Sequence, residues 1–232
     1  IPAEPLFRSR DLEDITPEHD SKLQMLIENL REKFAHPING DNKKVIVFTA
    51  FSDTAEYLYK NLAPAIKENA GLHTGLVTGD ALASTIPGLK ADFNLILTLF
   101  SPVSKEADKL LPNNHYEIDV LIATDCISEG QNLQDCDYLI NYDIHWNPVR
   151  IIQRFGRVDR IGSRNDVIQL VNYWPDIELD DYLSLKGRVE ARMTGVNITG
   201  AGNSNVLLSD EEQADLDYRK SQLQRLQEEV VD

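Results

Sequence analysis

The chain has 232 residues, with 23 lysines and arginines against 38 aspartates and glutamates, so its formal net charge is −15. This acidic balance, with a pI near 4.7, excludes binding to nucleic acid through bulk electrostatic attraction. The composition, 42% hydrophobic and 26% charged, is that of a folded globular protein. No run approaches the ~20 apolar residues of a membrane span, so no membrane association is expected.

Two further features of the sequence are the start of the chain and its two cysteines. The chain begins at Ile1 without a basic or apolar leader, from which we expect either a processed protein or, in preference, a piece of a longer, cytoplasmic protein. Cys126 and Cys136 lie ten residues apart without a Cys-x-x-Cys spacing or a matching histidine. We therefore expect two reduced thiols and no metal site.

Hydrophobic periodicity predicts the first elements. Residues 18–35 carry an apolar stripe at helical spacing, and 44–49 is a β-branched run typical of a strand buried on both faces. Ser52 or Asp53 is expected to cap the next helix, which stops at Gly71. Further along the chain the pattern predicts strands at 72–77, 119–124, 137–142 and 166–173, helices at 88–100 and 149–158, and a long loop at 101–117.

Strands and helices alternate over residues 44–174, which is typical of a mostly parallel sheet with helices on both faces. The predicted fold is α/β, three-layer α/β/α, with ligands at the carboxyl ends of the strands. Residues 1–17 are expected to be a loose leading segment and 18–175 the folded domain. Residues 176–232, with 13 acids against 6 bases, are expected to form a helical extension that could bind a protein partner.

A basic segment interrupts the acidic chain at residues 149–164, where five arginines face one aspartate. On a helix, Arg150, Arg154 and Arg157 fall within about 60° of one another, with Gln153 beside them. This face is expected to offer an anion site, and the alternative is that the arginines pair with acids elsewhere. Gly156, unfavourable inside a helix, suggests the close approach of another backbone or a ligand.

Polar groups also follow the strand at 119–124. Thr124 ends that strand, and the run Ser128-Glu129-Gly130-Gln131-Asn132 places hydroxyl, carboxylate and amide groups in a glycine-containing loop. Such a loop can cradle a ribose or a phosphodiester, although Thr124 and Asn132 taken singly are more often turn or cap residues.

These blocks together resemble a known family. The run 122–133 is similar to helicase motif V, the run 142–162 is similar to motif VI with the Trp-Asn-Pro flank of Swi/Snf-like ATPases, and 45–52 is similar to motif IV. The resemblance covers about residues 18–175. It implies the C-terminal, RecA-like lobe of a superfamily-two, Swi/Snf-like bacterial helicase or translocase.

The resemblance also implies roles for single residues. Arg157 and Arg160 match the arginine fingers, which reach the γ-phosphate across the cleft between two lobes. The positions that match nucleotide contacts are Gln153, Gly130, Asn132 and Gly156. The positions that match nucleic-acid contacts are Thr124, Thr49, Thr78 and Gly79.

The sequence contains no Gly-x-x-x-x-Gly-Lys-Ser/Thr loop. We therefore expect ATP and Mg²⁺ to be bound mainly by an N-terminal RecA-like lobe outside this chain, and the isolated chain to be inactive as an ATPase. Double-stranded DNA is the expected track. An RNA helicase lobe and a non-catalytic module that binds a protein partner remain alternatives.

Overall fold

The computed structural model describes residues 17–112, 115–127, 131–143, 148–160 and 162–173. The predictions for the leading segment up to residue 16 and for the helical extension lie outside these residues.

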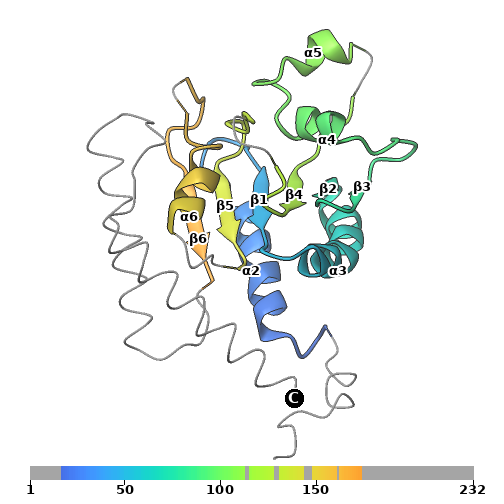
Figure 1. The fold of residues 1–232 in the computed structure, drawn as a ribbon, viewed down its shortest axis with the longest axis vertical. Coiled ribbons are helices and arrows are strands. Elements are labelled where there is room, and N and C mark those ends of the chain that lie inside the picture. The colour runs from blue at the N-terminus through green and yellow to red at the C-terminus, as the bar shows by residue number, and fades with distance from the viewer. Residues whose placement is uncertain (1–16, 113–114, 128–130, 144–147, 161, 174–232) are drawn as a thin grey trace, which may run out of the picture.

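Six strands form one sheet in the order β3-β2-β4-β1-β5-β6 (Figure 1). They are β1 (Val45–Phe48), β2 (Thr74–Val77), β3 (Leu82–Ser84), β4 (Val120–Ala123), β5 (Tyr138–Asn141) and β6 (Gln169–Asn172). All neighbouring strands pair in parallel except β2 and β3. The predicted mostly parallel sheet is therefore confirmed.

Helices pack on both faces of the sheet. The helices of the described chain are α2 (Ser21–Ala35), α3 (Ser52–Ala70), α4 (Phe93–Phe100), α5 (Ala107–Leu110) and α6 (Pro148–Phe155), of which the single turn α5 lies away from the sheet (Figure 1). Apolar side chains of α2 and α3 form one core with alternate strand residues such as Val47 and Ile122. Side chains of α4 form a second core with the other strand residues, including Phe48 and Leu121. Because successive strand side chains point to opposite faces, β1 and β4 are buried on both sides, as expected from their unbroken apolar runs.

Capping residues and a glycine determine where α2 and α3 begin or end. The Asp20 carboxylate accepts a hydrogen bond from the Leu23 backbone N–H at 3.0 Å and caps α2. Gly71, with a φ of 70°, ends α3 in the left-handed conformation, as predicted. The predicted cap of α3 is wrong: Phe51 is the N-cap residue and makes no side-chain cap bond. The Ser52 hydroxyl donates instead to Asp80 at 3.2 Å.

The region between β2 and β4 differs most from the sequence expectation. Strand β3 was not predicted, because only three residues follow the turn at 78–81 and pair with β2. The expected helix at 88–100 begins only at Phe93, since Gly88 has a φ of 73° and Asp92 caps the helix. The expected loop at 101–117 contains the single turn α5.

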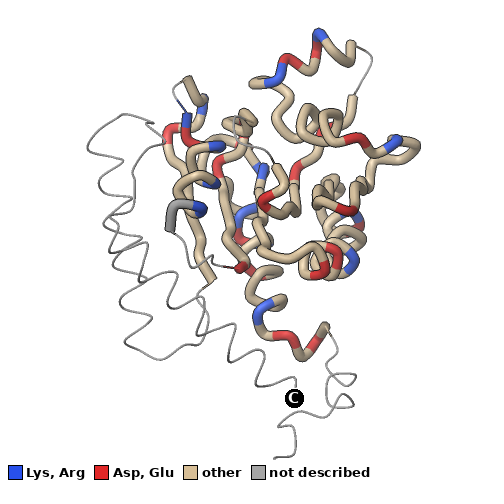
Figure 2. Tube along the Cα trace, in the orientation of Figure 1, with Lys and Arg blue, Asp and Glu red and all other residues tan. Residues whose placement is uncertain are grey.

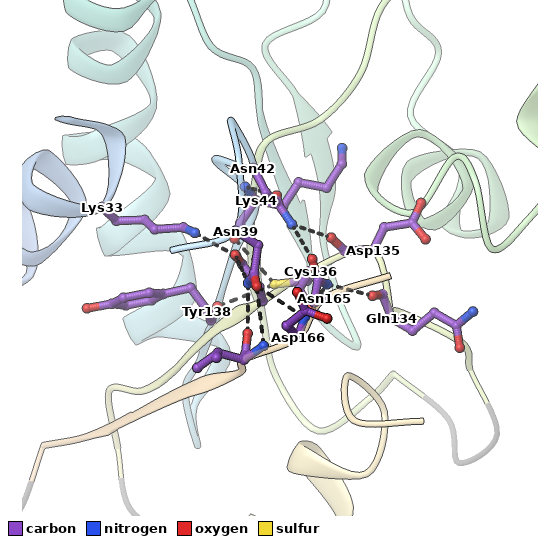
Figure 3. A network of polar contacts seen from close by, with 12 residues as sticks. Lys33, Asn39, Asn42, Lys44, Gln134, Asp135, Cys136, Tyr138, Asn165 and Asp166 are labelled. Carbon is purple, nitrogen blue, oxygen red and sulfur yellow. Dashed lines mark hydrogen bonds and ion pairs between the residues drawn. The ribbon is translucent and has the colours of Figure 1, made fainter. Parts of the chain in front are cut away.

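A polar network ties the amino ends of the strands to α2 (Figure 3). The Lys33 ammonium and the Asp137 carboxylate are fully buried and 2.6 Å apart. The Asn39 amide donates to Asp137 at 2.8 Å and accepts the backbone N–H groups of Asp166 and Val167. These bonds fix the starts of β5 and β6 relative to α2.

Candidate functional site

The carboxyl ends of β2, β4 and β1 lie side by side and present three threonines. Thr124 donates its backbone N–H to Val77 at 3.1 Å, and Thr49 donates its own to Ala123 at 2.9 Å. Thr78 follows Val77 directly. The structure therefore brings together Thr49, Thr78 and Thr124, which the resemblance assigns to nucleic acid, at the edge where parallel sheets bind ligands.

Two of these hydroxyls also shape the local turns. The Thr49 hydroxyl donates to the Phe51 carbonyl at 2.9 Å, and the Thr78 hydroxyl accepts the backbone N–H of Ala81 at 2.8 Å. Gly79, in the same turn as Thr78, is exposed, and a Cβ built on it meets no atom within 4 Å. Gly79 is thus accessible at this edge, whereas Thr49, Thr78 and Thr124 are buried, with exposed fractions of 0%, 5% and 7%.

The loop after β4 crosses toward the arginine segment. Leu133 donates its backbone N–H to the Arg157 carbonyl at 2.9 Å, so the two sequence blocks are in direct contact. The Asn132 side chain accepts the Gln134 N–H at 3.2 Å, which forms a turn. Its predicted contact with the ribose stays a prediction. Gly130, which precedes this turn, lies outside the described residues.

The expectation that Arg150, Arg154 and Arg157 share an anion-binding face is wrong for Arg154. Its side chain is fully buried, and its Nε and Nη2 donate to the two carboxylate oxygens of Asp125 at 2.7 and 2.8 Å. Its Nη1 donates to the Asn141 side chain at 2.8 Å, and its guanidinium lies 5.0 Å from the centre of the Phe48 ring. Arg154 therefore joins α6 to the ends of β4, β5 and β1.

The electrostatics of Asp125 agree with this arrangement. Burial alone would raise the pKa of the carboxyl, but the hydrogen bonds and charge of Arg154, with Arg150 and Arg157 nearby, outweigh it and lower the pKa below its ordinary value. Arg150 lies 3.7 Å from Asp125 and is half exposed. The alternative, that arginines of this segment pair with acids elsewhere, is thus the correct one for Arg154.

The two predicted fingers follow α6 directly. Arg157 is 6% exposed, and its guanidinium lies 5.8 Å from the centre of the Phe48 ring. Arg160 is half-buried and donates its Nε to the Gly156 carbonyl at 3.3 Å. Gln153 is half-buried one turn earlier on α6. Figure 2 shows Lys and Arg recurring along α6 and the loop after it.

The prediction that Gly156 lies inside the helix is wrong, whereas its predicted contact with a ligand stays a prediction. This residue lies after the last residue of α6 rather than inside the helix. Among the described residues, a Cβ at Gly156 meets only carbonyl oxygens of its own helix, the nearest being Ile152 at 3.4 Å. The position thus fits a helix end and shows no close approach of a second backbone.

A second candidate location is a cavity of about 850 Å³ at the amino edge of the sheet, opposite the threonines. Its lining mixes the acids Asp41, Glu117 and Asp135 with Lys43, Lys44 and Arg164. Lys44 is paired with Glu117 at 2.8 Å, and Asp135 accepts backbone N–H groups. Its polar groups serve the fold, so the chemistry is better placed at the arginine segment.

Sequence reasoning missed the partners of Arg154, which are Asp125 and Asn141, and the hydrogen bond from Lys105 Nζ to the Gln131 side chain at 2.7 Å. Asn141 is the last residue of β5 and Asp125 follows β4 by two residues, which was an available signal for groups at the carboxyl edge. The burial of Arg154 was also detectable, because its helical position lies about 60° from that of Ile151, a fully buried residue. Lys105 carried no signal, since it lies in an irregular segment far from the arginines in sequence.

Comparison with protein families decides the family. The family described as helicase conserved C-terminal domain matches residues 21–162, well over half of the chain. The chain belongs to the helicase conserved C-terminal domain family. The expected C-terminal helicase lobe is thereby confirmed, and the mostly parallel sheet agrees with the expected α/β fold.

Curated relatives of this helicase C-terminal domain are much longer than the chain. An uncharacterized ATP-dependent helicase, YqhH of Bacillus subtilis, is 55% identical over 51 residues, which are 22% of this chain and 9% of that protein. The ATP-dependent DNA helicase mph1 of Neurospora crassa is 28% identical over 152 residues, 65% of this chain and 12% of that protein. The RNA polymerase-associated protein RapA of Pectobacterium atrosepticum is 43% identical over 54 residues, 23% of this chain and 6% of that protein.

Solved structures of related domains are similar at low identity. The C-terminal part of the Fun30 ATPase domain has a TM-score of 0.48 and 17% identity, covering 88% of this chain and 54% of the other. The C-terminal domain of the DEAD-box protein Dbp5 has a TM-score of 0.45 and 18% identity, covering 74% and 78%.

The described residues contain neither a membrane-spanning helix nor a group of metal ligands. No helix in that part of the chain is long and apolar enough to cross a membrane. No three His, Cys, Asp or Glu side chains there are grouped so that they could hold a metal ion. Burial raises the pKa of the Cys136 thiol to about 12, and both cysteines are free.

Proposed function

We propose that this chain is the C-terminal lobe of an ATP-dependent DNA helicase or translocase. In this proposal it completes an ATPase site whose other half is an N-terminal RecA-like lobe. The observation that carries the proposal is the position of Arg157 and Arg160 directly after α6, with Arg157 bonded through its carbonyl to the loop after β4. Guanidinium groups in such a position can neutralise the charge that develops during phosphoryl transfer.

The proposal assigns ATP and Mg²⁺ mainly to the other lobe, because this sequence has no phosphate-binding loop of the Gly-x-x-x-x-Gly-Lys-Ser/Thr type. From this lobe, Arg157 and Arg160 act on the phosphates. The groups proposed to contact the rest of the nucleotide are Gln153, Gly130, Asn132 and Gly156.

The same lobe is proposed to hold double-stranded DNA at the carboxyl edge of the sheet. Thr49, Thr78, Thr124 and Gly79 are neutral groups there, suited to hydrogen bonds with a phosphate backbone. Arg154 supports a link between this edge and the fingers, since it belongs to α6 and binds Asp125, the neighbour of Thr124. Closure of the two lobes would then move both surfaces together.

Arginine variants of the full-length protein test the assignment. In Arg157→Ala and Arg160→Ala, DNA-stimulated ATP hydrolysis should fall roughly 10³-fold, because a finger supplies charge needed in the transition state. Lys109→Ala is the control, since Lys109 is exposed and paired with Glu106 within α5. Rates near wild type in both arginine variants would contradict the proposal.

An RNA helicase lobe is the second candidate function. It is favoured by the ATP-dependent RNA helicase dbp8 of Aspergillus oryzae, which is 27% identical over 73% of this chain and 34% of that protein. Stimulation of the ATPase by double-stranded DNA compared with single-stranded RNA separates the two candidates. A non-catalytic module predicts instead no ATPase in a two-lobe protein, and loss of a protein partner when residues 176–232 are deleted.

A further inference from the structure

Lys105 is held beside the arginine segment by the fold. It lies in the irregular segment between α4 and α5, which the Asp135 carboxylate fixes by accepting the backbone N–H groups of Val103 at 2.6 Å and Ser104 at 3.0 Å. The Lys105 N–H itself donates to the Ser101 carbonyl at 3.0 Å. The backbone is thus held by hydrogen bonds at Val103, Ser104 and Lys105 itself.

The ammonium of Lys105 has an amide as its partner rather than a carboxylate. Its Nζ donates to the Gln131 side-chain oxygen at 2.7 Å, in the loop after β4. Four other lysines of the described chain have a carboxylate oxygen within 2.8 Å; these are Lys22, Lys33, Lys44 and Lys109. Gln131 therefore orients the Lys105 ammonium without cancelling its charge.

Arg160 adds a second positive charge near Lys105, because Gln131, which binds Lys105, lies two residues before Leu133, and the Leu133 N–H donates to the carbonyl of Arg157, three residues before Arg160. Burial and the charge of Arg160 together lower the pKa of Lys105. Within the described ranges, neither side chain forms an ion pair with a carboxylate: Lys105 binds Gln131, and Arg160 binds the Gly156 carbonyl. Two like charges in a half-buried setting repel each other, so the arrangement favours an anion between or beside them.

We propose that Lys105 is a phosphate-binding residue that acts with Arg160 on the polyphosphate of the bound nucleotide. This inference rests on the proposed function, because it places a third cation at the same site. It adds to the site a residue from the segment between α4 and α5, which neither motif V nor motif VI contains. Gln131 is then a positioning residue that holds the lysine toward the phosphates.

Lys105 variants of the full-length protein test the inference. In Lys105→Ala, kcat/KM for ATP should fall about 10- to 100-fold, the scale of one charge-assisted hydrogen bond, whereas AMP binding should be unchanged. Lys105→Arg should retain most of the activity. Lys109→Ala, four residues along the chain and paired with Glu106, is the matched control and should behave as wild type.

The melting temperature distinguishes this role from a structural one. Because Lys105→Ala removes repulsion with Arg160, the melting temperature should stay the same or rise. If Lys105→Ala lowers both the melting temperature and the activity, Lys105 has a structural role, and the inference is overturned. Activity of Lys105→Ala near wild type with an inactive Arg160→Ala would overturn the inference alone. If both variants are active, the proposed function fails as well.

Discussion

Arg154 shows how one residue can change role between sequence and structure. By spacing it belongs with Arg150 and Arg157, yet its guanidinium is fully buried and bonded to both oxygens of Asp125. An arginine in this setting is satisfied by its planar set of donors, which a lysine could not reproduce. Its neighbours Arg157 and Arg160 then remain as the residues of the segment suited to phosphate.

Asp125→Asn should destabilise the chain by about 3 kcal/mol at neutral pH, because it leaves a buried guanidinium without its counter-charge. Urea unfolding measures the change. Asp143→Asn is the matched control: Asp143 pairs with Lys22, whose side chain is 42% exposed, and such a pair contributes at most about 1 kcal/mol. Equal losses in the two variants would contradict the buried-clamp role of Arg154.

The ion pair between Arg154 and Asp125 also predicts that stability depends on pH. Since the folded pKa of Asp125 is lowered, its contribution is complete above the ordinary carboxyl pKa of about 3.9 and is lost as the pH falls through the lower folded value. The stability difference between wild type and Asp125→Asn should therefore shrink in that acid range. A difference that stays constant as the pH falls would show that the charge of Asp125 is not involved.

At the scale of elements, the sequence was most informative where a pattern was long or strongly apolar. The strands β1, β4 and β5 and the helices α2 and α3 were predicted to within a few residues, because buried runs and helical stripes depend only on local spacing. Strand β3 was missed, since its three residues are half exposed and owe their conformation to pairing with β2. Tertiary pairing of this kind leaves little trace in a single sequence.

The end of α3 offers a test of these local rules. Gly71→Ala should destabilise the chain by about 1 kcal/mol, because alanine is strained at a φ of 70° although no atom lies within 4 Å of its Cβ. Gly79→Ala is the control, since its Cβ is equally unhindered and its φ is not in the left-handed range. Chemical denaturation measures both variants. If Gly71→Ala were as stable as Gly79→Ala, backbone strain would not explain the glycine.

At the scale of the whole molecule, the charge of −15 excludes a broad basic surface but permits a small basic site. We propose that this site contains Arg157 and Arg160, which the sequence already singles out. The sequence could not indicate Lys105 or the bonds of Arg154, because these depend on segments brought together only by the fold. In the structure, Arg154 joins the helix that precedes the proposed phosphate-binding residues to the carboxyl edge of the sheet.

We propose that this lobe supplies chemistry, rather than most of the nucleotide affinity, to a two-lobe ATPase. Single-turnover hydrolysis and equilibrium binding of ATP, measured on the same Arg160→Ala full-length protein with double-stranded DNA present, test it most directly. We predict that ATP still binds while the hydrolysis rate falls roughly 10³-fold. Hydrolysis at the wild-type rate, or a loss found entirely in ATP affinity, would contradict the account.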